Sequence, residues 1–523
     1  MGSMWIIFSI IGLIVLCLLV LLIMAARYQR DYWRYLEIPH EPPKKLWHIT
    51  KQLVTQSLST EQMKAAHYSA LYTKFKGQGP FCGFYALLQP RALVLESELI
   101  RQILIKDFAN FNDRGMYVNQ KTDPLSSDLY GRRGGLWQEM RRKLDPIFES
   151  ERMEWLYLSI YEEAKQLLLA VSTTLMQQSH STLHIQKMTR RYVLSSLASS
   201  VFGLDMGQRI KYSLEEFEQM TELVLSTRKH GYFMNLLMVR FPNFCRWLRM
   251  RTTPKEAEIY FVQLLHDMEA QREASGVRKK DFLQLLLDIK ELELTTHESE
   301  SESDKELKAH LQHELVAHAF GFLRAGFEQT SNTLCYVLYE LAINADVQRK
   351  VREELNLSLE RHHNNLSYEF IQSLNYMGQV ISETLRMHPI TPYIVRRTLN
   401  DYVVPDHPKF ILVKELFVII PTHAIHNDPE LYLSPHQFNP DRWGGPRDSL
   451  REQSTWFGFG VGARSCIGVQ LAQLQLRLAL ALLLLEYEFT LNSKRPLISC
   501  QDGIALKLTP LGVVEPGTEE RAV

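Results

Sequence analysis

Apolar residues recur at three- and four-residue spacing along much of the chain, which is the pattern of amphipathic helices. It is clearest in the segments 215–228, 280–292, 314–327 and 469–487. Strand candidates are short and interrupted by turn-forming residues, and they lie at 83–95, 402–406 and 409–422. The pattern therefore predicts a mainly helical body with small β-sheets.

The N-terminal segment departs from this pattern. From Met4 to Ala26 no residue carries a charge, and roughly 20 apolar residues are enough for a helix to span a bilayer. A cleaved signal peptide is the alternative, but its apolar region would be about 7–15 residues long and would follow positive charge. We therefore expect a transmembrane anchor over residues 1–27.

Positive charge follows the predicted anchor directly. Arg27, Arg30 and Arg34 come at its C-terminal side, whereas its N-terminal flank has no charged side chain. The positive-inside rule then leaves the rest of the chain in the cytosol. Prolines at 39, 42 and 43 favour a stiff connector, so we expect a linker over residues 28–50 and one catalytic domain over 51–523.

Two other segments have an unusual composition. Residues 297–308 are acidic and rich in serine, which favours a solvated, mobile loop between two long helices. Residues 233–251 mix aromatic residues with arginines. This mixture fits a membrane surface as well as it fits a core helix with a basic outer face.

Charge and cysteine content limit the possible partners. Lys and Arg number 59, as do Asp and Glu, so no global charge favours nucleic acid. Six cysteines lie far apart, without a CxxC pair, which fits a reducing compartment. No Gly-x-Gly-x-x-Gly segment follows a strand candidate, so we expect the chain to bind neither flavin nor nicotinamide and to receive electrons from a partner.

The strongest chemical signal is FGVGARSCIG, residues 459–468. A cysteine that binds haem iron is deprotonated, and backbone N–H groups and nearby cations make its charge tolerable. The glycines would let the backbone approach a macrocycle, and Arg464 could reach a propionate. A lone buried cysteine is usually only a small apolar residue. Here the complete pattern of Phe459, Gly462, Arg464, Cys466 and Gly468 resembles the haem-binding loop of the cytochromes P450.

This resemblance implies the cytochrome P450 fold, preceded here by one N-terminal transmembrane helix. It also implies haem b as the cofactor, held through the thiolate of Cys466. Glu383 and Arg386 are three residues apart and so lie on one helix face. The segment FNPDRW, residues 438–443, resembles the family segment that delivers a second arginine, Arg442. The three residues would form a buried triad beneath the haem.

The same resemblance identifies residues for the haem propionates. Trp137 and Arg141 are four residues apart in WQEMR, the spacing at which the family's third helix presents an indole and a guanidinium. Arg396 follows Arg386 by ten residues and resembles a further propionate partner, beside Arg464.

The segment AGFEQT, residues 325–330, resembles the family's oxygen-binding helix. There a small pair, here Ala325 and Gly326, makes room for dioxygen, while an acid and a hydroxyl relay protons. Glu328 matches the acid, but Gln329 stands where the family has threonine. Thr330 comes one residue later, and one helical step turns a side chain by about 100°. This departure puts the coupling of oxygen activation in doubt.

Two further stretches, residues 114–130 and 136–150, look most like the insect microsomal P450s of the large detoxification clan. By the same analogy, loops near residues 112–130 and 501–507 would line the substrate pocket.

We therefore expect a monooxygenase of the endoplasmic reticulum membrane, with its catalytic domain on the cytosolic face. It would insert one oxygen atom from O2 into a small lipophilic substrate. NADPH-cytochrome P450 reductase would supply electrons, with cytochrome b5 as a second candidate donor. A basic surface of Arg132, Arg133, Arg142 and Lys143 would attract the reductase.

Two alternatives remain open. A haem-thiolate isomerase or dehydratase acting on peroxides needs no proton relay, and Gln329 is the feature that favours it. The second alternative is a haem-bearing binding or sequestering protein.

Overall fold

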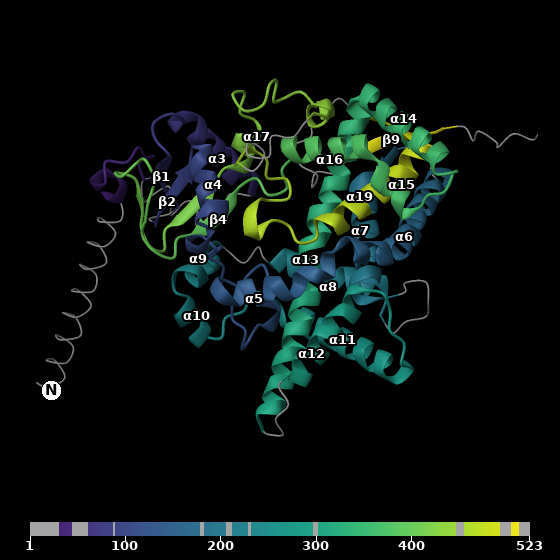
Figure 1. The fold of residues 1–523 in the computed structure, drawn as a ribbon, viewed down its shortest axis with the longest axis horizontal. Helices are drawn as coiled ribbons and strands as arrows, with labels where there is room; N and C mark the ends of the chain where they lie inside the picture. The colour runs from purple at the N-terminus through teal and green to yellow at the C-terminus, as the bar shows by residue number, and fades with distance from the viewer. Residues whose placement is uncertain are drawn as a thin grey trace, which may run out of the picture.

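The computed structural model describes residues 31–43, 61–86, 89–177, 182–204, 212–227, 232–296, 302–445, 454–491 and 504–511. The predicted anchor over residues 1–27 lies outside these residues, as do residues 501–503 of the second predicted substrate loop. Figure 1 shows the strands β1, β2 and β4 at one side of the molecule and a body of helices at the other.

The described helices agree with the apolar periodicity. The longer ones are α3 (Glu61–Phe75), α5 (Gly134–Leu144), α6 (Ser150–Gln177), α7 (Ile185–Phe202), α8 (Leu214–Thr227), α9 (Tyr232–Arg240), α11 (Lys255–Ser275), α12 (Phe282–Thr296), α13 (Glu302–Ile343), α14 (Ala345–Arg361), α16 (Asn375–Met387) and α19 (Val469–Glu486). Shorter ones are α4 (Ser97–Arg101), α10 (Pro242–Trp247), α15 (Tyr368–Ser373) and α17 (Thr422–His426), with single turns at η1 (Gln102–Lys106), η2 (Phe108–Asn110), η3 (Pro124–Ser126), η4 (Asp145–Phe148), η5 (Pro440–Trp443) and η6 (Gly462–Arg464).

The sheets are small, as the interrupted strand pattern predicted. β1 (Phe81–Ala86), β2 (Gln89–Val94), β7 (Phe417–Ile420) and β4 (Ile394–Arg397) form a four-stranded sheet in that order, with only the β2–β7 pair parallel. β3 (Thr182–His184), β9 (Ala505–Pro510) and β8 (Tyr487–Leu491) form a second sheet, and β5 (Tyr402–Val403) pairs with β6 (Ile411–Leu412). The body is therefore mainly α with small β-sheets.

The helix α13 organises the body. It is 42 residues long, which at about 1.5 Å per residue makes it long enough to cross the whole domain. It packs against α7, α12, α16 and α19, and Figure 1 shows it running through the middle of the molecule. The central part of α13 is therefore surrounded by other helices in the interior of the protein.

Part of the predicted acidic loop is instead helix. α13 begins at Glu302, so residues 302–308 belong to its first turns, and residues 297–301 lie outside the described part of the chain. The prediction of a loop was wrong for residues 302–308, because acidic side chains are favourable at a helix N-terminus.

The predicted linker is partly folded onto the body. Trp33 is fully buried and lies against Gly83 of β1, where an added Cβ would come within 2.4 Å of the indole. The Pro39 carbonyl accepts a hydrogen bond from the Gly83 N–H at 2.8 Å. Burial of Trp33 therefore joins residues 31–43 of the predicted linker to the sheet, and the domain bounds themselves stay a prediction.

One described helix, α19, is long and apolar enough to cross a membrane. Most of it is buried inside the protein, against α6, α13 and α14. We therefore interpret α19 as a core helix.

His318 is a buried histidine in α13. Neither ring nitrogen has a hydrogen-bond partner among the described residues. Burial, with smaller effects of Arg132 and Lys143, lowers the pKa of His318 from 6.5 to about 3. The ring is therefore neutral in the folded protein at physiological pH.

This pKa makes the fold sensitive to acid. The unfolded chain protonates His318 below about pH 6.5, whereas the folded protein does so only near pH 3, so stability is lost as the pH falls between these values. At pH 5 we expect His318 alone to cost about 2 kcal/mol relative to pH 7.5. His318→Leu should remove this loss in urea unfolding titrations at both pH values. His313→Leu, an exposed position on the same helix, is the control, and an equal pH dependence in His318→Leu and wild type would contradict the assignment.

Candidate functional site

The carboxylate of Glu383, in α16, is the centre of a buried polar network. Its side chain is 0% exposed, and so is that of Arg386 one turn later. Arg386 donates from Nε to Oε2 at 2.8 Å and from Nη2 to Oε1 at 2.9 Å. This fork satisfies both carboxylate oxygens, as a buried charge requires.

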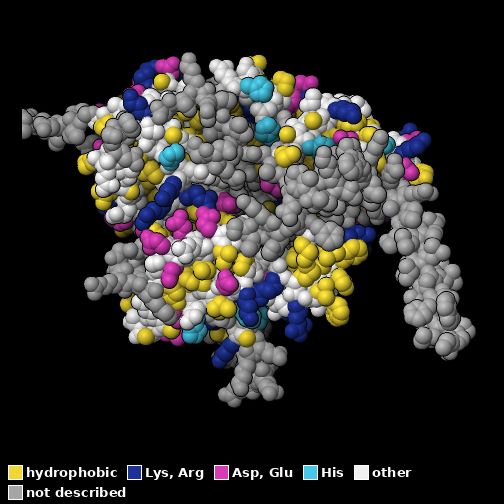
Figure 2. All heavy atoms as spheres, turned by 180° about the vertical axis from the view of Figure 1, so that it is seen from behind, with side chains coloured by type: hydrophobic (Ala, Val, Ile, Leu, Met, Phe, Trp, Pro, Cys, Tyr) yellow, Lys and Arg dark blue, Asp and Glu magenta, His cyan; other side chains and the backbone are white. Residues whose placement is uncertain are grey.

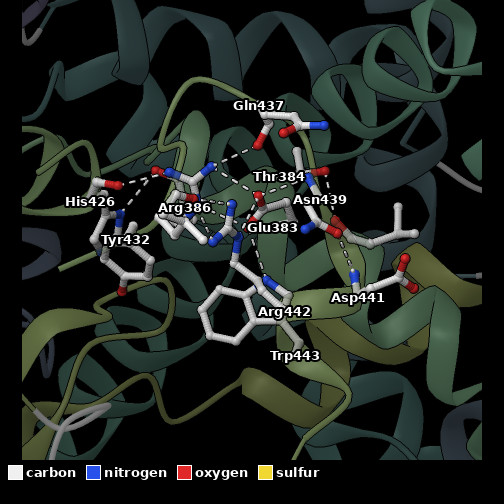
Figure 3. Close-up of polar contacts among 12 residues, drawn as sticks. Glu383, Thr384, Arg386, His426, Tyr432, Gln437, Asn439, Asp441, Arg442 and Trp443 are labelled. Atoms are coloured by element: carbon white, nitrogen blue, oxygen red, sulfur yellow. Dashed lines mark hydrogen bonds and ion pairs between the residues drawn. The ribbon is translucent and has the colours of Figure 1, made fainter. Parts of the chain in front are cut away.

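The FNPDRW segment completes the network around Glu383 (Figure 3). Arg442 donates from Nε to Oε1 at 3.0 Å, and Trp443 donates from Nε1 to Oε2 at 3.0 Å. The Asn439 N–H donates to Oε1 at 3.0 Å. The structure thus brings Glu383, Arg386 and Arg442 together. Trp443 and Asn439 belong to the same motif, but the sequence reasoning did not assign them this contact.

His426 connects this network to the cysteine loop. Its Nδ1–H donates to the Arg386 carbonyl at 3.1 Å, and its Nε2 accepts from the Phe457 N–H at 3.0 Å. The ring stacks on Phe457 with centroids 5.7 Å apart. Burial lowers the pKa of His426 to about 3, which keeps the neutral form that both hydrogen bonds need. Nothing in the local sequence had identified His426.

The cysteine loop is a tight turn that ends at α19. The Cys466 N–H donates to the Phe459 carbonyl at 2.7 Å and closes the turn. Gly462 has a φ of +70°, and an added Cβ would lie 2.0 Å from the Leu104 carbonyl oxygen of η1. Only glycine fits there, because the backbone is left-handed and η1 is in contact. Gly468 is the first residue before α19 and has a negative φ.

Cys466 differs from the other described cysteines. Cys82, Cys245 and Cys335 are buried, whereas the Cys466 side chain is exposed. The protein packed around Cys466 desolvates its thiol, and this raises the pKa of the thiol. The Gly468 N–H and the charge of Arg141 partly oppose this effect. The N–H group and the cation expected around a thiolate are therefore present, but they do not outweigh the effect of desolvation on the thiol pKa.

Within the described part of the chain, two buried arginines, one in this loop and one near it, form no ion pair. Arg464 and Arg396 are both buried, and in each the Nε has no hydrogen-bond partner within the described part of the chain. Burial, followed by the charge of Arg114, lowers the pKa of Arg396 to about 9 and that of Arg464 to about 8. Buried guanidinium groups need anions, so the pair forms a site for negatively charged groups.

Trp137 and Arg141 extend this site from α5. The Arg464 guanidinium lies over the Trp137 ring at 4.4 Å. Arg141 donates from Nη1 to the Ser465 carbonyl at 2.9 Å, next to Cys466, and also bonds Asp145. The structure therefore brings all four predicted propionate residues to the neighbourhood of the cysteine loop.

Arg114 is a further member that the sequence reasoning missed. It stacks on the Tyr130 ring at 3.9 Å and donates to the Tyr130 carbonyl at 3.1 Å, and Arg464 donates to the same carbonyl at 3.4 Å. Burial lowers the pKa of Arg114. A single arginine in a loop carries no spacing signal, so only its neighbours in space identify it.

The oxygen-helix residues divide between two faces of α13. Ala325 and Gln329 have exposed side chains although they lie in the middle of an interior helix, whereas Thr330 is buried. Thr330 therefore does not share the face of Gln329, as the helical step of about 100° requires. A Cβ on Gly326 would lie 3.1 Å from Leu197, so this glycine lets α13 pack closely on α7. Glu328 is partly buried.

The predicted basic surface is smaller than expected. Arg132 bonds Glu314 at 2.6 Å and is largely buried, and Lys143 lies between Glu139 and Glu293. Arg133 pairs with Asp113 but remains exposed, as does Arg142. The prediction was wrong for Arg132 and Lys143, because neighbouring acids neutralise them.

The comparisons with known proteins agree with one another. The family model of the cytochromes P450 matches residues 39–514. The chain is 70% identical to the probable cytochrome P450 317a1 of Drosophila melanogaster, over 99% of this chain and 100% of that protein. It is 33% identical to cytochrome P450 6a2 of the same species, over 88% and 90%, and 34% identical to cytochrome P450 6A1 of Musca domestica, over 90% and 89%.

The network around Glu383 predicts a large effect of Arg386→Ala. The variant leaves a fully buried carboxylate without its bidentate partner, which costs roughly 3–5 kcal/mol. We expect the free energy of unfolding to fall by that amount and haem incorporation to be lost, as measured by denaturant titration and by haem content.

Arg349→Ala is the matched control for this experiment. Arg349 pairs with Asp346 and Glu353 at the same three- and four-residue spacings, but its side chain is 62% exposed. The control should lose little or no stability, because water screens an exposed ion pair. An Arg386→Ala protein as stable and as haem-loaded as the control would show that the buried pair has no structural role.

Proposed function

The chain belongs to the cytochrome P450 family, whose members are haem-thiolate monooxygenases, and on this premise we propose that it oxygenates a small lipophilic substrate with Cys466 as the haem ligand. Its relatives in Drosophila and Musca agree with the resemblance to insect P450s. The observation that carries the proposal is the closed cysteine loop, with an exposed thiol near two buried arginines whose Nε atoms have no hydrogen-bond partner among the described residues.

The residues around Cys466 fit haem b. The unpartnered Nε atoms of Arg396 and Arg464 call for buried anions, and the two propionates of haem b are such groups. Trp137, Arg141 and Arg114 would hold them from α5 and the loop before it. When bound through a thiolate, haem b supplies the iron chemistry that activates O2.

The chain's own residues would position the substrate and move protons. The exposed Ala325 would leave room beside α13, and Glu328 would serve as the acid that delivers protons during oxygen reduction. Thr330 is a poor candidate for this relay, because its side chain is buried on another face. Gln329 has the exposed position, but an amide is not an acid. Proton delivery should therefore depend on Glu328 and water.

A second site on the surface supports membrane association. Phe241, Phe244, Trp247 and Leu248 are exposed large hydrophobic residues at α10, and Trp247 is 76% exposed. Figure 2 shows hydrophobic side chains beside basic ones at the lower right of the molecule, where α10 lies. Large exposed apolar side chains next to arginines suit a membrane surface. With the predicted anchor over residues 1–27, they support a location on the cytosolic face of the endoplasmic reticulum.

Electrons would come from a separate protein. We infer that NADPH-cytochrome P450 reductase is the donor, with cytochrome b5 as a second candidate. The exposed Arg133 and Arg142 would contribute to an attraction for an acidic partner.

The assignment of Cys466 predicts the loss of one spectroscopic signature. Cys466→Ala should abolish the absorption band of the reduced carbon monoxide complex that is typical of a thiolate ligand. Cys335→Ala, a change at a buried cysteine in α13, is the control and should keep the band. If Cys466→Ala retains it, another residue binds the iron.

The exposed Gln329 predicts inefficient coupling. Much of the NADPH consumed should end as hydrogen peroxide or water, and Gln329→Thr should raise the product formed per NADPH by at least about twofold, because a hydroxyl can pass on protons. Thr330→Val is the control and should change nothing, since that side chain is buried. The measurement is product per NADPH with one substrate and reconstituted reductase.

The same comparison tests the alternative function. An isomerase or dehydratase acting on peroxides would turn over without NADPH, and Gln329→Thr would leave that reaction unchanged or impair it. Tight coupling in the wild type would show that another group delivers the proton.

A further inference from the structure

An ion pair crosses from the predicted substrate loop to the oxygen helix. Arg324, the residue before Ala325 in α13, donates from Nη2 to Oδ2 of Asp128. The Asp128 side chain is 2% exposed and that of Arg324 is 12% exposed. A charged side chain at this position is costly unless it has a partner or a purpose.

Helix α13 leaves room for the Asp128 side chain at Gly321. Gly321 lies one turn before Arg324, and an added Cβ there would come within 2.9 Å of the Asp128 Cβ and 3.1 Å of its Oδ2. The Gly131 N–H donates to Asp128 Oδ1 at 2.9 Å. Both carboxylate oxygens are therefore occupied, and the carboxylate fixes the orientation of the Arg324 guanidinium.

The guanidinium keeps donors for another molecule. It has five N–H donors, and within the described part of the chain its only hydrogen bond is the one to Asp128. Its side chain is 12% exposed. A molecule that reaches this exposed part of the side chain would meet the remaining N–H groups.

Two guanidinium groups lie around the carboxylate of Asp128. It bonds Arg324, and its charge partly opposes the lowering of the Arg114 pKa by burial. The Arg324 guanidinium lies 5.9 Å from the Tyr130 ring, on which Arg114 also stacks. Glu328, four residues after Arg324, is the other acid on this side of the helix, and its proposed role is in proton delivery.

We propose that Arg324 is a specificity-determining residue that binds the carboxylate of a lipophilic acid, with Asp128 as the positioning residue that holds its guanidinium. This inference rests on the proposed function, since it names the substrate class of that site. A neutral lipophile would leave the donors of Arg324 unsatisfied, whereas a carboxylate accepts them as charge-assisted hydrogen bonds.

Equilibrium binding to the haem-loaded enzyme tests the proposal. The probes are dodecanoate, methyl dodecanoate and 1-dodecanol, and binding is followed by the shift of the haem absorbance band. We expect the wild type to bind dodecanoate at least about tenfold more tightly than the ester, which corresponds to about 1.4 kcal/mol. Arg324→Met should abolish this preference and leave the affinity for the ester unchanged.

Two further variants separate recognition from folding of the loop. Asp128→Asn keeps an amide oxygen that can accept from Arg324 and hold its guanidinium, but it removes the competing negative charge, so the preference for the acid should be retained or increased. Arg132→Met breaks a similar ion pair, to Glu314, between the same loop region and α13. It should leave the ratio of acid to ester affinity unchanged.

The outcomes distinguish failure of the proposed haem-thiolate site from failure of the assignment of Arg324. If the thiolate band is absent from the wild type, the proposed haem-thiolate site is wrong and the inference falls with it. If the band is present but acid and ester bind equally, only the assignment of Arg324 is overturned. Loss of the acid preference in Asp128→Asn or Arg132→Met to the same extent as in Arg324→Met would also overturn it, because closure of the loop would then be the determinant.

Discussion

The structure depends on the compensation of one buried carboxylate, that of Glu383. A charge with no exposure to water destabilises a fold by several kcal/mol unless donors surround it. Here two guanidinium groups, an indole N–H and a backbone N–H converge on it. These donors come from α16 and from a segment more than fifty residues later, so folding cannot satisfy the carboxylate until both parts are in place.

The position of Cys466 follows from this network through a short chain of contacts. Arg386 offers its carbonyl to His426, and His426 accepts from the N–H of Phe457 at the start of the cysteine loop. On the other side, Arg141 donates to the Ser465 carbonyl. The loop is thus held from α16 and from α5, while Gly462 allows η1 to pack against it. A thiol fixed from several sides is preorganised to bind a metal.

Sequence reasoning succeeded where the pattern lies within a short segment of the chain. It failed where contacts between distant segments decide the role of a residue. The helices follow from apolar periodicity, and the contacts of Glu383 from the spacing of ETLR together with FNPDRW. Arg114 and His426 belong to no spaced motif, so only their neighbours in space identify them, and Trp443 lies in FNPDRW without a spacing that indicates its bond to Glu383. The charges of Arg132 and Lys143 misled for the same reason, since Glu314 and Glu293 neutralise them from other helices. Trp33 is buried against the β1 backbone at Gly83, where a side chain would leave no room for the indole. No property of the linker indicates this contact.

The loop before α5 joins the two sides of the proposed site. The Tyr130 carbonyl accepts from Arg114 and Arg464, and the Tyr130 ring faces Arg114 and Arg324. The first set of contacts belongs to the proposed propionate site and the second to the proposed substrate side. One residue therefore contacts the guanidinium groups of both proposed sites. On the proposed assignments, haem binding and substrate specificity would be coupled through Tyr130, and the ion pair of Asp128 with Arg324 ties the loop to α13.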